Sequence, residues 1–197
     1  MPSARKLDTR EAILDAALRC FDERGVVNTG IEDIRKAAGA SPSSMYHQFD
    51  GLPAIVAALL ERTLVRRYGS VTKKVVRVKK AREAVETLVK AHLAWVMESP
   101  VEARFMYRAL ALDMDEGHRE ALVATKMQLK AELTAHFTKL GVGVHGMPAD
   151  SFIDVILLGT THQACRRWLA APGAVEAKWM KKWLPQLAWR TVGAARA

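Results

Sequence analysis

Apolar residues recur at helical spacing in almost every stretch of this chain, and the alternation typical of strands is nearly absent. The N-terminal stretch is one example, because its apolar residues follow one another at helical intervals: Ile13, Ala16, Ala17, Cys20 and Phe21. Residues at these intervals share one face of an α-helix, whereas in a strand they would scatter over both faces. The sequence therefore predicts an all-α protein.

Helix boundaries follow from capping and breaking residues. Asp8 and Glu11 have the spacing of a capping box, and Gly25 suits the end of the helix that they would open. Pro53 suits the first turn of a later helix that extends through Leu64 and into a basic stretch. The remaining pattern predicts helices at roughly 82–98, 102–112, 115–140, 149–170 and 174–193.

Composition excludes several classes of protein. Half of the 197 residues are hydrophobic and 26% are charged, so the chain can bury a core and is neither disordered nor fibrous. It has no apolar run long enough for a membrane span, and its polar start lacks the apolar stretch of a signal peptide, so we expect a cytoplasmic protein without membrane contact. Cys20 and Cys165 lie far apart, which predicts buried thiols rather than a disulfide framework or zinc site.

The charge balance is basic but unevenly distributed. Thirty Lys and Arg residues against 21 Asp and Glu residues give a net charge of +9, which favours an anionic partner such as nucleic acid. Residues 1–50, however, hold seven basic and eight acidic residues, while residues 62–82 hold nine basic residues and no acid. We expect the basic stretch to be mainly a solvated helix face. DNA binding by the N-terminal part must therefore rest on a motif.

Residues 31–49 have the pattern of a helix-turn-helix. Thr29 and Glu32 form a possible capping box for a short helix that stops at Gly39, and Ser41 with Pro42 suits the start of the next helix. A glycine in this turn permits a left-handed backbone, which lets the second helix cross the first steeply. Four apolar residues are expected to hold the two helices together: Ile34, Ala38, Met45 and Phe49.

The identities of these residues resemble a known family. The segment TGIEDIRKAAGASPSSMYHQF, with a helix before it and a proline-started helix after it, is similar to the N-terminal domain of TetR/AcrR transcriptional regulators. The family pattern of Asp-Ile-Ala, Ala-Gly-Val-Ser and Leu-Tyr-x-His-Phe corresponds here to Asp33–Arg35, Ala38–Ser41 and Met45–Phe49. The resemblance covers about a quarter of the chain. It implies a helix-turn-helix DNA-binding domain at 1–51 and a helical effector-binding and dimerisation domain at 52–197.

The resemblance also places the residues that contact DNA in this sequence. They are Thr29, Ser41, Pro42, Ser43, Ser44, Tyr46 and His47, and Gln48 is a further candidate that could read an adenine. The sequence departs from the family pattern at four positions, where Ser43 replaces glycine, Gln48 histidine, Gly30 a Thr or Ser, and Leu52 a lysine. Loss of that lysine is expected to weaken non-specific binding, since each neutralised phosphate contributes to affinity.

The C-terminal part is expected to hold an effector and to pair with a second copy. Flexible methionines and aromatic residues suit an apolar cavity, although the same types also fill ordinary cores: His92, Trp95, Met97, Phe105, Met106, Tyr107, Met114, Met127 and His162. The candidates for a homodimer interface are Phe152, Ile156, Gly159, Trp179, Trp183 and Leu187, with an intramolecular core as the alternative for the tryptophans. We expect Pro185 to kink the last helix.

The leading hypothesis is a ligand-responsive, homodimeric repressor that binds a near-palindromic double-stranded DNA operator. Its effector would be a small apolar or aromatic molecule, with no cofactor and no metal. The alternative is an all-α small-molecule-binding or enzymatic domain whose helix-turn-helix is only structural. Gly141, Gly143 and Gly146 have the spacing of a dinucleotide-binding fingerprint but follow a helix rather than a strand, and we expect no enzyme.

Overall fold

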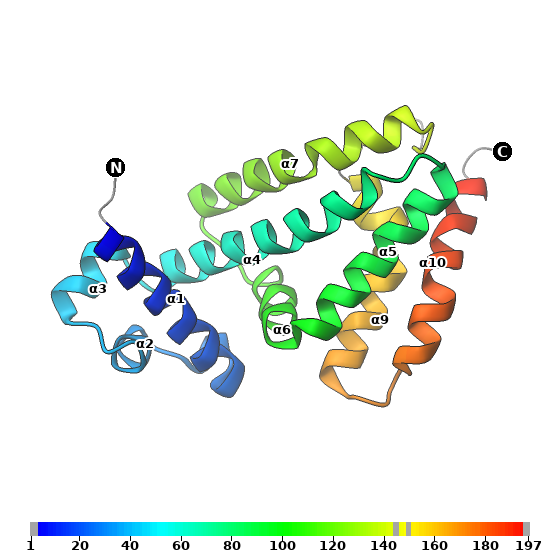
Figure 1. Ribbon diagram of the computed structural model, residues 1–197. Helices are drawn as coiled ribbons and strands as arrows, with labels where there is room; N and C mark the ends of the chain where they lie inside the picture. The colour runs from blue at the N-terminus through cyan, green and yellow to red at the C-terminus, as the bar shows by residue number, and fades with distance from the viewer. Residues whose placement is uncertain (1–3, 144–145, 149–150, 195–197) are drawn as a thin grey trace. The chain divides into compact units, whose positions relative to one another are not determined.

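A computed structural model describes residues 4–143, 146–148 and 151–194, and it contains helices and no strand in those ranges, as the sequence predicts (Figure 1). Its elements in chain order are α1 (Ala4–Arg24), the 3₁₀ turn η1 (Val26–Asn28), α2 (Ile31–Ala37), α3 (Pro42–Gln48), α4 (Leu52–Val75), α5 (Ala81–Glu98), α6 (Pro100–Ala109), α7 (Glu116–Lys139), the π-helical turn η2 (Phe152–Leu157), α9 (Gly159–Ala170) and α10 (Ala177–Ala194).

These elements form two compact units. The first unit comprises the chain up to Leu64 together with Val101–Val123, and the second comprises Val65–Pro100 together with the chain from Ala124 onward. The helices α4, α6 and α7 therefore each contribute residues to both units. Each unit is described by itself below.

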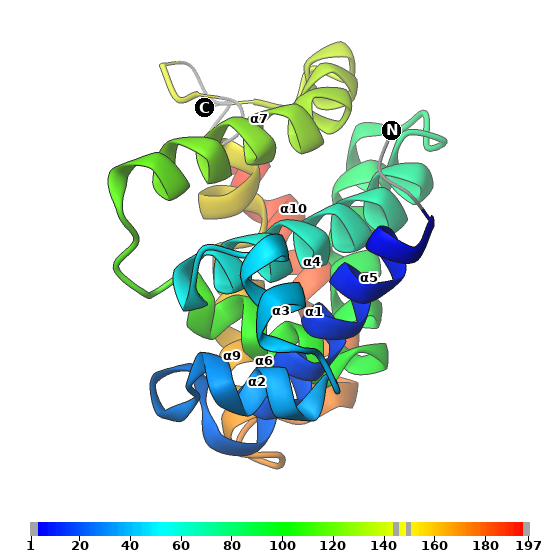
Figure 2. The ribbon, with the colours of Figure 1, turned by 90° about the vertical axis from the view of Figure 1, so that its left-hand side faces the viewer.

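In the first unit, α1 is the central helix, and α2 and α3 pack against it (Figure 2). The apolar face predicted for α1 is buried, and the ring of Phe21 stacks on that of Phe105 from α6 with centroids 5.6 Å apart. Next to this contact, Arg104 forms an ion pair with Asp22. Burial of aromatic and aliphatic side chains is the main stabilising contribution here.

In the second unit, α10 lies along α5 and also contacts α9 and η2 (Figure 1). Leu88 and Val96 of α5 are buried together with Met180 and Leu184 of α10. Pro185 is buried inside α10, which continues through it to Ala194.

Two predictions for helices outside the helix-turn-helix are wrong. The first helix begins at Ala4, so Asp8 lies inside it and is not its N-cap. The single helix predicted for 149–170 is instead interrupted, because η2 ends at Leu157 and α9 begins at Gly159. Residues 149–150, where that predicted helix would start, lie outside the described ranges, as do residues 144–145 of the preceding loop. The start of α4 at Leu52 and its extension into the basic stretch agree with prediction.

Both cysteines are free and buried, as predicted. Among the described residues, none of the helices is sufficiently long and apolar to cross a membrane.

Candidate functional site

The turn between α2 and α3 is held by local hydrogen bonds. Gly39 has a φ of +62°, the left-handed conformation that side-chain-bearing residues adopt at a cost. Arg35 Nη1 donates to the Ala40 carbonyl at 3.0 Å, and the Ser44 amide donates to Ser41 Oγ at 3.2 Å. Ser41 is thus the N-cap of α3 and Pro42 occupies its first turn, as predicted. This arrangement fixes the direction in which α3 leaves the turn.

The helix α3 has one buried face and one exposed face. Met45 and Ile34 have no exposed surface and Phe49 has 4%, so three of the four residues expected to join the helices do pack inside, while Ala38 is half-buried. The predicted DNA contacts on the other face are exposed: Ser41, Pro42, Ser43, Tyr46 and His47. Ser44 and Gln48 are half-buried. Tyr46 stands out among them because 55% of so large a side chain is exposed.

Thr29 does not act as the expected N-cap of α2. Its side chain is buried, and its Oγ1 donates to the Gly25 carbonyl at 2.8 Å, with the Cys20 carbonyl at 3.3 Å. Gly30 is the N-cap instead, and its amide donates to Asp33 Oδ2 at 2.9 Å. That hydrogen bond is the largest cause of the lowered pKa of Asp33. The predicted box of Thr29 and Glu32 is therefore wrong by one residue, because Thr29 ties α2 to the end of α1.

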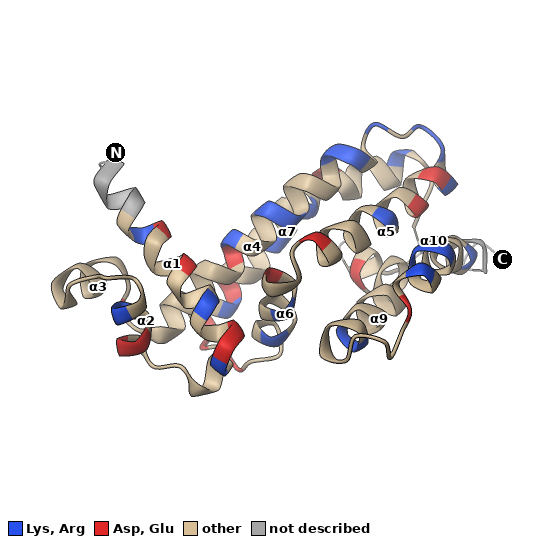
Figure 3. Ribbon diagram, turned by 60° about the horizontal axis from the view of Figure 1, so that its bottom comes forward, with Lys and Arg blue, Asp and Glu red and all other residues tan. Residues whose placement is uncertain are grey.

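Formal charge is absent from α3. Its seven residues include no Lys, Arg, Asp or Glu, and its ribbon is uniformly tan in Figure 3. One cation that contacts α3 is Arg10 of α1. Its guanidinium lies 4.5 Å above the Phe49 ring, and its Nη1 donates to the Gln48 carbonyl at 3.5 Å. Leu52, at the position where the resemblance implies a lysine, is half-buried at the start of α4.

Comparison with known proteins decides the family. The profile of the family described as bacterial regulatory proteins, tetR family, matches residues 13–59. The HTH-type transcriptional repressor KstR2 of Rhodococcus jostii is 30% identical over 179 residues, which cover 86% of this chain and 84% of that protein. The chain belongs to the TetR/AcrR family. It is thus a DNA-binding transcriptional regulator, and the alternative of a merely structural helix-turn-helix is not favoured.

Solved structures agree in fold over nearly the whole chain. The regulator FadR from Bacillus subtilis, solved in complex with stearoyl-CoA, superimposes with a TM-score of 0.76 at 15% identity, covering 92% of this chain and 98% of that one. A TetR family regulator from Marinobacter aquaeolei superimposes with a TM-score of 0.74 at 17% identity and covers 95% and 97% of the two chains. These likenesses concern the fold, and the relatives compared are described as transcriptional regulators.

The nine residues predicted to line an effector pocket are divided between the two units. Phe105, Met106, Tyr107 and Met114 belong to the first unit. Of the five in the second unit, Met127 is 59% exposed, and Met97 lines a surface hollow of about 450 Å³ between α5 and Lys181. The two histidines do meet, because the rings of His92 and His162 are 4.8 Å apart. The centroid of the Trp95 ring lies 6.0 Å from that of His92.

A partly buried basic cluster includes these histidines. We define it as Arg67, His92, Lys126, Lys130, Asp154 and His162, all from the second unit. Arg67 is 4% exposed, and its Nε donates to Nδ1 of His92 at 3.1 Å. Lys130 Nζ lies 2.6 Å from Asp154 Oδ2, and Lys126 Nζ lies 3.9 Å from the same oxygen. Tyr68 donates to the other oxygen of Asp154 at 3.4 Å.

Burial and charge perturb the ionisable groups of this cluster. Burial, with Arg67 beside it, holds the pKa of His92 well below its usual range, and burial lowers the pKa of His162 to about 3. Burial acts to raise the pKa of Asp154, but the neighbouring cations, Lys130 foremost, outweigh it and lower that pKa. Burial raises the pKa of Tyr68 to about 12. At neutral pH both imidazoles are uncharged, and Asp154 is a carboxylate.

The sequence did not indicate this cluster. The basic stretch was expected to be mainly a solvated face, and most of it is exposed, but Arg67 and Arg62 point inward. Arg62 Nη1 forms 2.8 Å ion pairs with Glu11 and Asp15 of α1 in the first unit. One signal was present, because Asp154 is the single acid within the apolar run 152–159.

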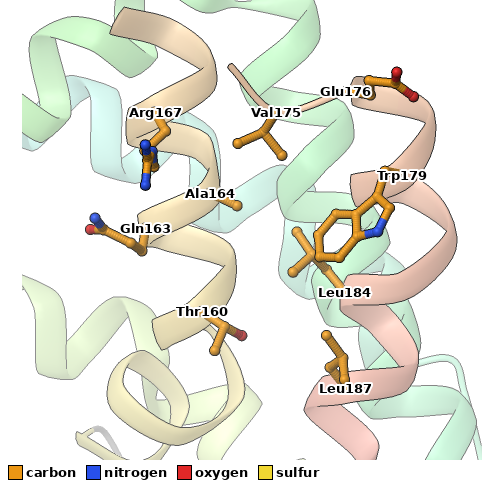
Figure 4. A pocket seen from close by; sticks show the side chains of 9 residues that line it. All are labelled: Thr160, Gln163, Ala164, Arg167, Val175, Glu176, Trp179, Leu184 and Leu187. Atoms are coloured by element: carbon orange, nitrogen blue, oxygen red, sulfur yellow. The ribbon is translucent and has the colours of Figure 1, made fainter. Parts of the chain in front are cut away.

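Two of the six predicted dimer residues, Trp179 and Leu187, line a groove in the second unit. Figure 4 shows the side chains that line it, which come from α9, from α10 and from the segment between these helices. The groove has a volume of about 710 Å³ and is lined by Thr160, Gln163, Ala164, Arg167, Val175, Glu176, Trp179, Leu184 and Leu187. Trp179 is 45% and Trp183 37% exposed, which is unusual for tryptophan. Phe152 is buried, whereas Ile156, Gly159 and Leu187 are half-buried.

No group of three or more metal-ligating side chains occurs in the described ranges.

Proposed function

We propose that this chain is a homodimeric, ligand-responsive repressor that binds a near-palindromic operator through α3. The observation that carries the proposal is the exposed face of α3, held in a fixed direction by Gly39 and the Ser41 cap. A helix presented in this way can place its first turn in the major groove of DNA. Residues 1–51 would form the DNA-binding domain and residues 52–197 the domain for effector binding and dimerisation.

Side chains other than Lys, Arg, Asp and Glu would make the contacts of α3 to DNA. Ser43 and Pro42 permit a close approach to base edges, while Tyr46 and His47 are long enough to reach the sugar-phosphate backbone. Ser44 and Gln48 are half-buried and would contribute from the border of this surface. The hydroxyl of Thr29 already donates a hydrogen bond to a backbone carbonyl. Its contribution to DNA binding would therefore be to position α2.

A second copy of the chain would cover the groove between α9 and α10. Exposed tryptophans and the apolar residues beside them match the composition of homodimer interfaces, in which aromatic residues are enriched. Two-fold symmetry would then place two α3 helices about one DNA turn (~34 Å) or somewhat more apart.

The effector would act by binding one dimer conformation more tightly than another, since only differential affinity shifts such an equilibrium. The FadR structure with stearoyl-CoA supports an effector site in this fold. In this chain, the region of the second unit around His92 and His162 would be the place for such a site. A cytoplasmic location follows from the role proposed.

The proposal is tested by selecting bound sequences from a random DNA pool with the purified protein. We expect an inverted repeat, bound with an affinity that falls steeply as salt is raised. Tyr46→Ala should weaken binding of that repeat at least tenfold while the protein stays folded and dimeric. Tyr46→Phe, which removes only the hydroxyl, should weaken binding of the repeat less than Tyr46→Ala does. A folded protein that enriches no sequence would overturn the proposal.

A further inference from the structure

The first unit contains an open pocket that is formed by three separate segments of the chain. These segments are the 3₁₀ turn η1, the first turns of α4, and the residues that lead from α6 into α7. All residues that line the pocket belong to the first unit. The pocket has a volume of about 510 Å³, which is a size typical of sites for small molecules.

The lining of this pocket is mainly apolar. Eight of its eleven residues have apolar side chains, and they lie at different depths. Val26 and Val56 are 8% and 7% exposed, Leu52 and Met114 are half-buried, and Val27 is 88% exposed. A ligand with an apolar body that covers Val27 and the half-buried residues would remove apolar surface from water, which favours binding.

The remaining lining residues are Asp113, Asp115 and His118. Asp115 accepts a hydrogen bond from the His118 amide at 3.0 Å, and its other oxygen contacts Nδ1 of the same residue. These contacts lower the pKa of Asp115, which is therefore a carboxylate at neutral pH. The carboxylate of Asp113 is different, because it forms no hydrogen bond or ion pair with the residues that the structure describes. It is available to a ligand.

Positive charge is absent from the described lining, which includes no Lys or Arg. Arg119 follows the lining residue His118, but its Nη2 donates to the Met114 carbonyl at 2.8 Å and so holds the loop before α7. Leu52 stands where the resemblance implies a lysine, and a lysine there would bring a positive charge to the apolar wall. A pocket with carboxylates and without lysine or arginine favours a cationic ligand over an anionic one.

We propose that this pocket binds an organic cation, whose apolar body lies against Val27, Leu52 and Met114 and whose ammonium group pairs with Asp113. The site goes beyond the proposed function, since it lies in the first unit and not around His92 and His162 in the second. Its lining includes the turn that precedes α2 and the first turn of α4, which follows α3. A ligand that binds one arrangement of these segments more tightly than another changes the affinity for DNA.

Nuclear magnetic resonance of methionine methyl groups tests the site directly. The methionines of the full-length protein are isotope-labelled, and the signal of Met114 is assigned by its loss in Met114→Leu. Tryptamine, a cation, is titrated alongside the neutral tryptophol and the anionic indolepropionate, and octylamine alongside octanol and octanoate. We expect at least one amine to shift the Met114 signal, with a Kd about fivefold or more below that of the matching alcohol. An unchanged signal, or an equal Kd for the alcohol, overturns the inference.

Replacement of the unpaired carboxylate tests the assigned ion pair. Asp113→Asn should weaken binding of the amine about fivefold and leave that of the alcohol unchanged. Glu120→Gln, which removes an exposed carboxylate of α7 outside the lining, should change neither. Normal binding of the amine by Asp113→Asn would show that the ammonium group does not pair with this residue and would overturn the inference.

Addition of a cation to the lining is a second test. Leu52→Lys should weaken binding of the amine because the like charges repel each other. Val27→Lys changes a residue that is 88% exposed, so it serves if the Leu52 variant does not fold, and the same loss is expected. Val123→Lys, at an exposed residue outside the lining, should bind the amine normally. Equal binding by Val27→Lys and Val123→Lys would contradict the proposed site.

Operator binding is measured separately, by fluorescence anisotropy on the selected inverted repeat with and without the amine. Asp113→Asn at the same amine concentration corrects for competition between the amine and the protein at DNA phosphates. A shift of the Met114 signal together with a changed operator affinity supports the site and its influence on DNA binding. A shift without such a change supports the site and contradicts that influence. Normal operator binding without a shift overturns the inference and leaves the DNA-binding role supported.

Discussion

Arg104 holds Asp22 through two parallel hydrogen bonds, Nε to Oδ1 at 2.9 Å and Nη2 to Oδ2 at 3.2 Å. The preceding residue of α1 and the following residue of α6 are in contact as well, because the ring of Phe21 stacks on that of Phe105. A bidentate ion pair beside a stacked aromatic pair fixes both distance and orientation. Within the first unit, α6 is therefore attached to the helix against which α2 and α3 pack.

Breaking this pair should destabilise the first unit. Asp22→Asn leaves the Arg104 guanidinium, which is about 30% exposed, without its carboxylate, and we expect a loss of about 1–2 kcal/mol in unfolding free energy. Urea denaturation measures this loss. Arg82→Gln breaks the more exposed pair with Glu86 and should cost less than about 0.5 kcal/mol. Equal effects of the two substitutions would contradict the assigned role of Asp22.

Two glycines test the turn between α2 and α3. A Cβ on Gly39 would meet no atom within 4 Å, yet its φ of +62° makes Gly39→Ala strained, and we expect a loss of about 1–2 kcal/mol. A Cβ on Gly69 meets no atom either, but Gly69 lies inside α4, so Gly69→Ala should raise stability by up to about 1 kcal/mol. Opposite signs in urea denaturation are expected. A neutral Gly39→Ala would show that the turn does not require the left-handed conformation.

Stability should fall in mild acid because of His92, which is buried, and His162, which is half-buried. Their pKa values are lowered in the folded protein, that of His162 to about 3, whereas in the unfolded chain each is near 6.5. Below pH 6.5 the unfolded state therefore binds more protons than the folded state. The contribution of the neutral histidines to the free energy of unfolding is complete above that pH and is lost as pH falls toward 3. At pH 5, each histidine kept neutral lowers the unfolding free energy by about 2 kcal/mol.

Denaturation at pH 7.5 and pH 5 checks this expectation. The lowered pKa values of Asp154 and Glu86 affect stability only in more acidic solution, so they do not obscure this interval. Replacing His92 and His162 together by glutamine should flatten the pH dependence. His47→Gln, on the exposed face of α3, should leave it unchanged. A double variant as sensitive to acid as the original chain would exclude these histidines as its cause.

The groove between α9 and α10 predicts how the dimer can be broken. Trp179→Glu places a charge in an apolar surface that a second copy would cover, and we expect dissociation to monomers at micromolar concentration. Val123→Glu, at a residue of α7 that is 51% exposed, should leave the dimer intact. Sedimentation velocity distinguishes the two results. Retention of the dimer in Trp179→Glu would assign the interface to another surface.

Local rules predicted the helix-turn-helix well, because its conformation is set by residues close in sequence. Ser41 caps α3, and Met45 and Phe49 face inward at the positions that helical periodicity gives them. The sequence predicts the N-cap of α2 one residue too early, and the reason is a contact with a residue distant in sequence. Thr29 has a suitable cap side chain, but packing against α1 uses its hydroxyl, and Gly30 takes the cap position with Asp33.

The interior of the second unit was much less predictable. Arg67 and Arg66 are adjacent members of one basic run, and only the packing of α4 places the first inside and the second outside. Lys130 and Asp154 lie 24 residues apart and meet only in the folded protein. The π-helical turn that carries Asp154 shifts every later residue relative to a regular helix, which periodicity alone does not show.

The lack of formal charge on α3 bears on how this regulator would find its site in a cell. Salt acts on the contacts between cations and phosphates, which operator and random sequences share. If α3 discriminates through hydroxyl, amide and aromatic groups only, salt should lower both affinities in parallel and leave their ratio nearly constant. Changes in ionic strength would then alter the total amount of protein bound to DNA, and would alter far less its preference for the operator over other sequences.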